Sequence, residues 1–316
     1  MRVLYDVFRR DPSLFMLVTL VVIIAPFFFI GGPDKTSGPI FGAIWNLGHI
    51  IFFALVLMAV QIKSSLTSWR RWLLVTLIVF SLGCLIEYLQ SKIGREANWQ
   101  DVINNLAGAW FGMFWLQRAN LMVWLARLAV LVLLVPPFAH LAQLVHSKYQ
   151  AVQMFPVLAD FEQDAQLHRW AGAGTRSIVQ FAPDNRVLKV ELGTERYSGM
   201  GLRRFLGDWS HAEVLAFDLY NPDQEPLTMV VRVHDLEHEL GDYALNDRFN
   251  TRLEIHHGWN HFYFDVAQIQ NAAATRKLDL QKIRGIEFFA RELPKARVIF
   301  VDNLRLESRS ANNPDK

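Results

Sequence analysis

The sequence contains one cysteine, Cys84, among 316 residues, so no intramolecular disulfide can form. This says little about the compartment, because an oxidising space permits disulfides without requiring them. A Gly-rich phosphate loop after a strand, a Gly-x-Ser-x-Gly elbow, internal repeats and low-complexity tracts are also missing. The usual sequence signatures of nucleotide binding and of serine hydrolases are therefore absent.

A strong charge of one sign is missing too, since the formal net charge is only +2. Residues 1–159 hold 12 Lys and Arg against 6 Asp and Glu, whereas residues 160–307 hold 18 against 23. Without a basic stripe, this balance argues against nucleic acid as a partner. The composition changes near residue 140, which predicts two domains.

Charge is scarce in the apolar runs of the first domain, and each run is treated as a candidate membrane span. The first run follows three arginines, is longer than a usual signal-peptide core and is followed by further spans, so we expect an uncleaved helix. Residues 1–140 are thus predicted to form an α-helical membrane bundle of about five transmembrane helices. The expected spans are 13–30, 40–62, 72–90, 102–116 and 121–139, the last closed by Pro136 and Pro137.

Lys and Arg flanking the spans predict the topology. One set of loops, with the N-terminus, holds eight Lys and Arg, and the opposite set holds three. We therefore expect a multi-pass protein of the cell membrane with a cytoplasmic N-terminus. The C-terminal domain would then be periplasmic or extracellular.

The stretch 83–112 places polar groups inside predicted membrane helix. Glu87 and Asp101 would each cost about 2.5–3.5 kcal/mol in hydrocarbon unless paired or hydrated, so they are candidate site residues. Helical spacing puts Glu87 and Gln90 on one face, and Asp101, Asn104 and Asn105 on one face of the next helix. A packed, hydrogen-bonded helix pair remains the alternative.

Asp34-Lys35, Gly48-His49, Glu87-x-x-Gln90, Arg95 and Asp101-x-x-x-Asn105-x-x-Gly108 resemble the motifs of the VanZ-like family of small membrane proteins, over residues 30–117. The family is named for a protein linked to low-level glycopeptide resistance. The resemblance implies a cell-envelope protein linked to antibiotic resistance, and the predicted topology places its site at the outer face. The implied ligand-binding residues are Asp34, Lys35, His49, Glu87, Gln90, Arg95, Asp101, Asn104 and Asn105.

Two functions fit this site. It is a recognition pocket for a glycan or the head group of a lipid-linked cell-wall precursor, or it is the centre of a membrane enzyme acting on such a substrate. In the enzyme, Glu87 or Asp101 would be the acid or base and His49 a proton relay. A purely structural anchor is the third alternative.

The second half alternates apolar and polar residues in short runs separated by turn signals, such as VLAFDLY and LTMVVRVHD. This predicts a linker at 141–159, an all-β jelly-roll sandwich at 160–308 and a disordered tail at 309–316. The arrangement is similar to carbohydrate-binding, galactose-binding-like domains. Such a domain of about 150 residues can bury a core without disulfides.

Aromatic and polar residues in or beside loops suit a sugar site, because rings stack on sugars while Arg and Asn bind hydroxyls. The candidates are Trp209, Tyr243, Arg248, Asn250, His257 and Trp259. The jelly-roll resemblance also implies a structural calcium held by Glu162 and Asp302, although a hydrogen-bonded strand end explains the same residues. We expect His234, His238, His256, His257 and His261 to be surface groups rather than zinc ligands.

Overall fold

The computed structural model describes residues 11–28, 32, 37–92 and 98–308. Three predicted site residues, Asp34, Lys35 and Arg95, lie outside the described residues, as does the predicted tail 309–316. The chain divides into two compact units, Met1–Leu144 and Val145–Lys316, and each is described by itself.

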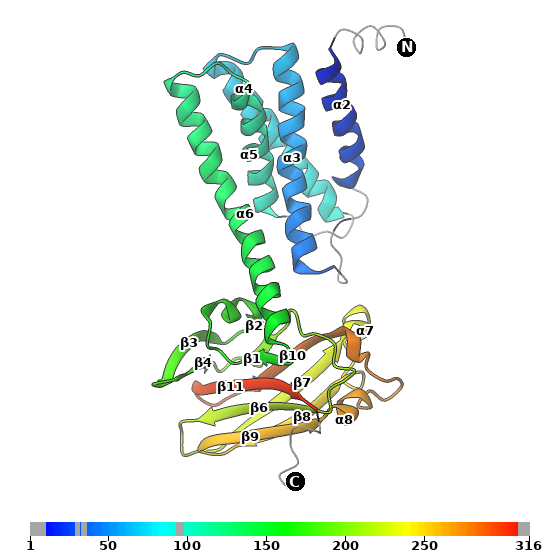
Figure 1. Ribbon diagram of the computed structural model, residues 1–316, viewed down its shortest axis with the longest axis vertical. Coiled ribbons are helices and arrows are strands. Elements are labelled where there is room, and N and C mark those ends of the chain that lie inside the picture. The colour runs from blue at the N-terminus through cyan, green and yellow to red at the C-terminus, as the bar shows by residue number, and fades with distance from the viewer. Residues whose placement is uncertain (1–10, 29–31, 33–36, 93–97, 309–316) are drawn as a thin grey trace. The chain divides into compact units, whose positions relative to one another are not determined.

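The first unit is helical (Figure 1). Its elements are α2 (Pro12–Ile24), the 3₁₀ turn η1 (Ala25–Phe28), α3 (Pro39–Lys63), α4 (Trp69–Lys92), α5 (Trp99–Trp115) and α6 (Leu121–Met154), which continues into the second unit. Among the described residues, α3, α4 and α6 are long and apolar enough to cross a membrane. Helices α2 and α5 have 13 and 17 residues. The apolar helices suggest membrane association, and the count of about five spans is not confirmed.

Helix α6 does not end at Pro136 and Pro137, as the sequence predicted, but runs on to Met154. Each proline removes one backbone N–H and so leaves one carbonyl without its helical donor. Such losses are tolerated within long apolar helices. The predicted linker at 141–159 therefore begins as helix, and its last three residues form the strand β1 (Val157–Ala159).

Two glycines of α5 bring that helix against the backbone of α3. A Cβ atom at Gly108 would lie 2.2 Å from the carbonyl oxygen of Ile50, and one at Gly112 would lie 2.3 Å from that of Ala54. Only glycine allows backbones to approach this closely. Asn105, three residues before Gly108 on α5, faces Gly83 of α4. A Cβ atom at Gly83 would lie 3.0 Å from the Nδ2 atom of Asn105.

The second unit is an antiparallel β-sandwich (Figure 1). One sheet has the order β3-β4-β11-β6-β9, with β1 paired to β11, and the other has the order β2-β5-β10-β7-β8. The strands of the first sheet are β3 (Thr175–Ala182), β4 (Asn185–Leu192), β6 (Val214–Asn221), β9 (Gly258–Asp265) and β11 (Arg297–Glu307). Those of the second are β2 (Trp170–Ala171), β5 (Ser198–Leu202), β7 (Leu227–Asp235), β8 (Phe249–Ile255) and β10 (Ile283–Ala290).

Alternation along the strands builds the core between the two sheets. Residues Met229, Val231 and Val233 of β7 point inward and are fully buried. Short helical elements complete the unit: η2 (Asp164–Arg169), α7 (Leu236–Leu240), α8 (Val266–Gln270) and η3 (Leu280–Lys282). The sequence predicted a β-sandwich here, and the structure has one.

Candidate functional site

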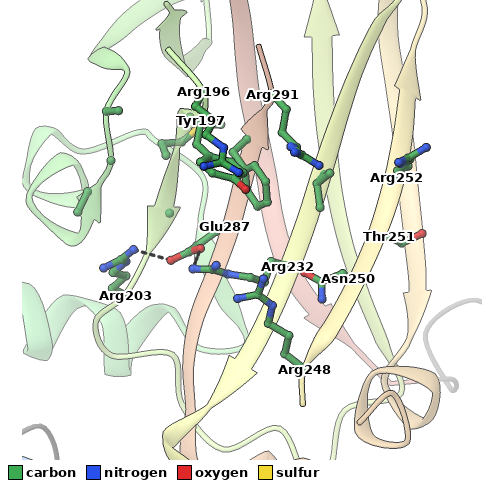
Figure 2. A pocket seen from close by; sticks show the side chains of 18 of the residues that line it. Arg196, Tyr197, Arg203, Arg232, Arg248, Asn250, Thr251, Arg252, Glu287 and Arg291 are labelled. Atoms are coloured by element: carbon green, nitrogen blue, oxygen red, sulfur yellow. Dashed lines mark hydrogen bonds and ion pairs between the residues drawn. The ribbon is translucent and has the colours of Figure 1, made fainter. Parts of the chain in front are cut away.

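The outer face of the five-stranded sheet carries a groove of about 910 Å³. It is called here the arginine groove (Figure 2). Side chains from outward positions of neighbouring strands, and from the residues that flank them, form its polar lining. These are Arg196, Tyr197, Arg203, Arg232, Arg248, Asn250, Thr251, Arg252, Glu287 and Arg291.

Strand register arranges the groove in rows across the sheet. Position 287 of β10 pairs with Gly201 of β5 on one side and with Arg232 of β7 on the other, and Arg232 pairs with Asn250 of β8. The next row runs in the same way from Gly199 through Phe289 and Val230 to Arg252. Each row alternates with buried residues, so the polar groups of a row share one face.

The glycines of β5 set the depth of the groove. A Cβ at Gly199 would lie 2.1 Å from the carbonyl oxygen of Phe288, and one at Gly201 would lie 2.6 Å from the Cγ of Glu287. A side chain at either position would collide with β10, so β5 adds no side chain to the groove at these two places. The floor is therefore low on this side, and Arg203 stands at the rim.

Glu287 is the acid of the groove lining and is buried by two arginines. Its carboxylate accepts a bond from Arg203 Nη2 at 2.6 Å and forms an ion pair with Arg232 (Figure 2). Burial, followed by repulsion from Arg248 and Arg203, lowers the pKa of Arg232 to about 10. Burial also lowers the pKa of Arg248. Both groups stay protonated at neutral pH, so the lining keeps its positive charge.

Tyr197 fixes two arginines at one end of the groove. Its ring is about half exposed, and the guanidinium carbons of Arg196 and Arg291 lie 5.6 and 5.4 Å from the ring centroid. The edge of this ring meets Phe289 at a centroid distance of 5.8 Å. Cation–π contacts of this kind are worth about 0.5–1 kcal/mol at exposed sites. The ring therefore holds both guanidinium groups beside the groove.

A hydrogen-bonded chain of His238, Asp247 and Arg276 holds Arg248 in place. Arg248 Nη1 donates to His238 Nε2 at 3.4 Å, and His238 Nδ1 lies 3.3 Å from Asp247. This pattern corresponds to a neutral His238 whose Nδ1–H donates to Asp247. Burial lowers the pKa of His238, which favours the neutral form. Arg276 binds both Asp247 and Asp235, at 2.6 Å each, and fixes the carboxylates in turn.

The structure separates the six predicted sugar-binding residues. Arg248 and Asn250 line the arginine groove. Tyr243 is exposed and its ring packs edge-on against His238. His257 directly precedes β9 of the other sheet, and Trp259 is the second residue of that strand, where it packs against Phe181 and Tyr220.

Trp209 is fully buried, and its indole N–H donates to the carbonyl of Leu206 at 2.9 Å. Burial leaves no ring face for a sugar, so this residue belongs to the core. The expectation that His234 and His238 are surface groups is also wrong, because they are 3% and 1% exposed. The end of β7 and the helix α7 carry them inward.

Sequence reasoning missed most of the groove, although a signal was present. Outward positions of adjacent strands repeat every second residue: Arg248-x-Asn250-x-Arg252, Glu287-x-Phe289-x-Arg291 and Tyr197-x-Gly199-x-Gly201-x-Arg203. Arginine at alternate positions of a half-buried strand marks a solvent face. Which strands lie side by side is set by topology, and the pattern alone does not supply it.

The two proposed calcium ligands are held by hydrogen bonds within the chain. Glu162 Oε1 accepts the backbone N–H of Arg186 at 3.0 Å, and the Asp302 carboxylate accepts from Asn185 Nδ2 and the N–H of Asn303. Burial, and then the charges of Asp218 and Glu162, raises the pKa of Asp302. Among the described residues, no group of three or more His, Cys, Asp or Glu is arranged to hold a metal. The calcium hypothesis stays a prediction.

The helical unit gathers the other predicted residues into buried contacts. His49 Nδ1 of α3 lies 2.9 Å from Asn105 Oδ1 of α5, and both side chains are buried. Glu87 Oε2 of α4 accepts the backbone N–H of Asn98, which caps α5. Glu87 also lines a hollow of about 260 Å³ with Asn98, Trp99 and Tyr88. Gln90, Asp101 and Asn104 are buried as well.

No protein-family model matches this sequence, and no curated protein matches it. The VanZ-like resemblance therefore rests on the short motifs alone. Known structures resemble about half of the chain. A family 11 carbohydrate-binding module from Clostridium thermocellum, in complex with a mixed-linked β-1,3-1,4 tetrasaccharide, is 18% identical (TM-score 0.36), and the match covers 48% of this chain and 94% of the module.

A second module, the non-crystalline cellulose-specific CBM28, is also 18% identical, with a TM-score of 0.35 over 49% of this chain and 94% of the module. An exo-β-agarase is 18% identical with a TM-score of 0.39, and the match covers 51% of this chain and 25% of the agarase. The matched region thus spans about a quarter of the agarase's length.

Proposed function

We propose that this chain is a membrane protein of the cell envelope that binds glycan through the arginine groove of its β-sandwich. The observation that supports this best is the groove itself, a hollow of about 910 Å³ on one sheet face. Its lining combines the exposed ring of Tyr197 with donors and acceptors from Asn250, Thr251 and the arginines. Rings, amides and guanidinium groups are the side chains that bind sugar hydroxyls.

The apolar helices α3, α4 and α6 would hold the protein in the membrane. The bias of Lys and Arg places the β-sandwich outside the cytoplasm in this proposal. The buried polar residues of α3, α4 and α5 would then engage the head group of a lipid-linked cell-wall precursor. The VanZ-like motifs extend this to altered glycopeptide susceptibility, which growth of a deletion strain on the antibiotic would test.

A glycan array tests the main proposal. The full-length protein in nanodiscs of uncharged lipid is compared with an Asn250→Ala, Tyr197→Ala double variant. Both positions are exposed, so the fold should survive the change. Binding that the double variant weakens supports the groove. Binding that is equal in both proteins, or absent from both, contradicts the proposal.

A further inference from the structure

Six of the fourteen arginines in residues 160–307 line the groove. Residues 160–307 are acidic overall, with 18 Lys and Arg against 23 Asp and Glu. The groove lining, in contrast, has six arginines and one glutamate. A local surplus of positive charge in a hollow attracts anions and suppresses the binding of cations.

Every basic residue of the lining is arginine, and none is lysine. A guanidinium presents a planar set of donors that fits carboxylate, sulfate or phosphate with two parallel bonds. Glu287 accepts from one Nη atom of Arg203 and from one Nη atom of Arg232. Arg196, Arg252 and Arg291 are exposed, and within the described part of the chain none of the three forms an ion pair with an Asp or Glu. Donor capacity is therefore left for a ligand.

The positive surface continues beyond the groove. A second hollow of about 760 Å³ shares Ala171 and Arg203 with it and is also lined by Arg176, Arg204 and His168. The two hollows are thus contiguous across the short strand β2. A single small anion would fill only part of this surface, whereas an extended chain would use all of it.

We propose that the arginine groove binds a polysaccharide chain that carries carboxylate or sulfate groups along its length. This inference rests on the proposed function and specifies its ligand class. A membrane surface fits less well, because the floor of Gly199, Gly201 and Val230 lies below the arginines that flank it. Head groups arrayed in a plane would reach the rim alone, while a chain can follow the floor.

Two matched pairs of polymers test the ligand class: polygalacturonate with its methyl ester, and dextran sulfate with dextran. Binding of the full-length protein in uncharged detergent is measured by calorimetry. We expect at least one charged polymer to bind about tenfold or more tightly than its neutral partner, since hydrogen bonds to charged groups are the stronger ones. Raising the salt concentration from ~0.05 M to ~0.5 M should weaken this binding strongly.

Variants locate the site. Arg252 and Arg291 are exposed, so an Arg252→Gln, Arg291→Gln double variant should fold and should lose about tenfold or more in affinity for the charged polymer. Arg305→Gln is the matched control, because Arg305 lies on β11 of the other sheet and is partly exposed. The control should bind like the unchanged protein.

Each other outcome overturns the inference in a distinguishable way. Equal binding of charged and neutral polymers, weakened by the double variant, removes the anionic class and leaves the proposed glycan function intact. Binding to phosphatidylglycerol vesicles without binding to any of the four polymers removes both and identifies an anionic lipid surface. Polymer binding that the double variant leaves unchanged also rules out both the anionic ligand class and glycan binding by the groove.

Discussion

Glu287 and Arg232 lie opposite each other on β10 and β7, and their side chains form an ion pair in the middle of the arginine groove. Arg203 approaches the same carboxylate from β5. One acid thus separates two guanidinium groups that would otherwise repel each other. Its contributions to folding and to binding should have opposite signs.

We predict that Glu287→Gln destabilises the fold by about 1–3 kcal/mol, because the largely buried Arg232 and the more exposed Arg203 both lose their charged acceptor. The same change makes the groove more positive, so the affinity for a charged polymer should stay equal or increase. Thermal unfolding and calorimetry measure the two effects. Glu254→Gln, at an exposed position of β8 outside the lining, is the control. A variant that is as stable as the original protein would show that the ion pair is unimportant.

Histidine burial predicts how stability depends on pH. Burial, and then the charge of Arg232, lowers the pKa of His234 from 6.5 to about 3. Between these values the unfolded chain binds a proton that the folded chain does not, so stability falls as the pH falls from 6.5. The slope for one proton is up to about 1.4 kcal/mol per pH unit. The lowered pKa of His238 likewise makes stability fall as the pH falls. The raised pKa of Asp302 has the opposite effect, because the folded chain then holds the proton more tightly than the unfolded chain does.

The measurement is the unfolding free energy of the full-length protein from pH 7 to pH 4.5. His234→Gln should flatten this dependence relative to the unchanged chain. His256→Gln, at an exposed position, should leave it as it was. An identical slope in all three proteins would assign the pH dependence to other groups.

The contact of Gly108 with Ile50 predicts a large effect of one methyl group. A Cβ at position 108 meets backbone that cannot rotate away, so Gly108→Ala should destabilise the helical unit by about 1–3 kcal/mol or more. Gly48→Ala on α3 is the control, because nothing lies within 4 Å of its added Cβ. Unfolding in detergent distinguishes the two. Equal midpoints would mean that α3 and α5 do not pack as described.

Calcium binding by Glu162 and Asp302 stays testable through linkage. If the two carboxylates share an ion, adding chelator to calcium-saturated protein should lower its unfolding midpoint, because an ion bound only to the native state stabilises it. Asp302→Asn should abolish that shift. An unchanged midpoint would leave Asn185, Asn303 and Arg186 as the partners that explain these residues.

Seven runs with strong alternation predicted β4 and β6–β11, whereas β1, β2, β3 and β5 were missed. In β5, Ser-Gly-Met-Gly-Leu has little alternation. The glycines of β5 weaken its sequence signal as a strand, and the same glycines lower the floor of the groove. Arg248 and Asn250 were predicted because they lie in or beside loops. Arg232 and Arg252 were not predicted, because only the pairing of β7 with β8 brings them to the same sheet face.

Trp209 was predicted to belong to the sugar site, although it belongs to the core. It stands between turn residues, Asp208 and Ser210, that are exposed, and yet its ring is fully buried. A loop places its residues near the surface, but the direction of each side chain depends on the core beneath it. In the helical unit, the polar stripe of α5 was predictable from helical spacing, whereas the glycine contact with α3 needed the fold.

The residues of the arginine groove stand mainly on paired strands rather than on long loops, and this has a consequence for the kinetics of binding. Strand backbone is already ordered, so few loop conformations need to be lost when a ligand arrives. The encounter would then be governed by electrostatic attraction between the hollow and the approaching chain. Added salt should accordingly slow association more than it speeds dissociation.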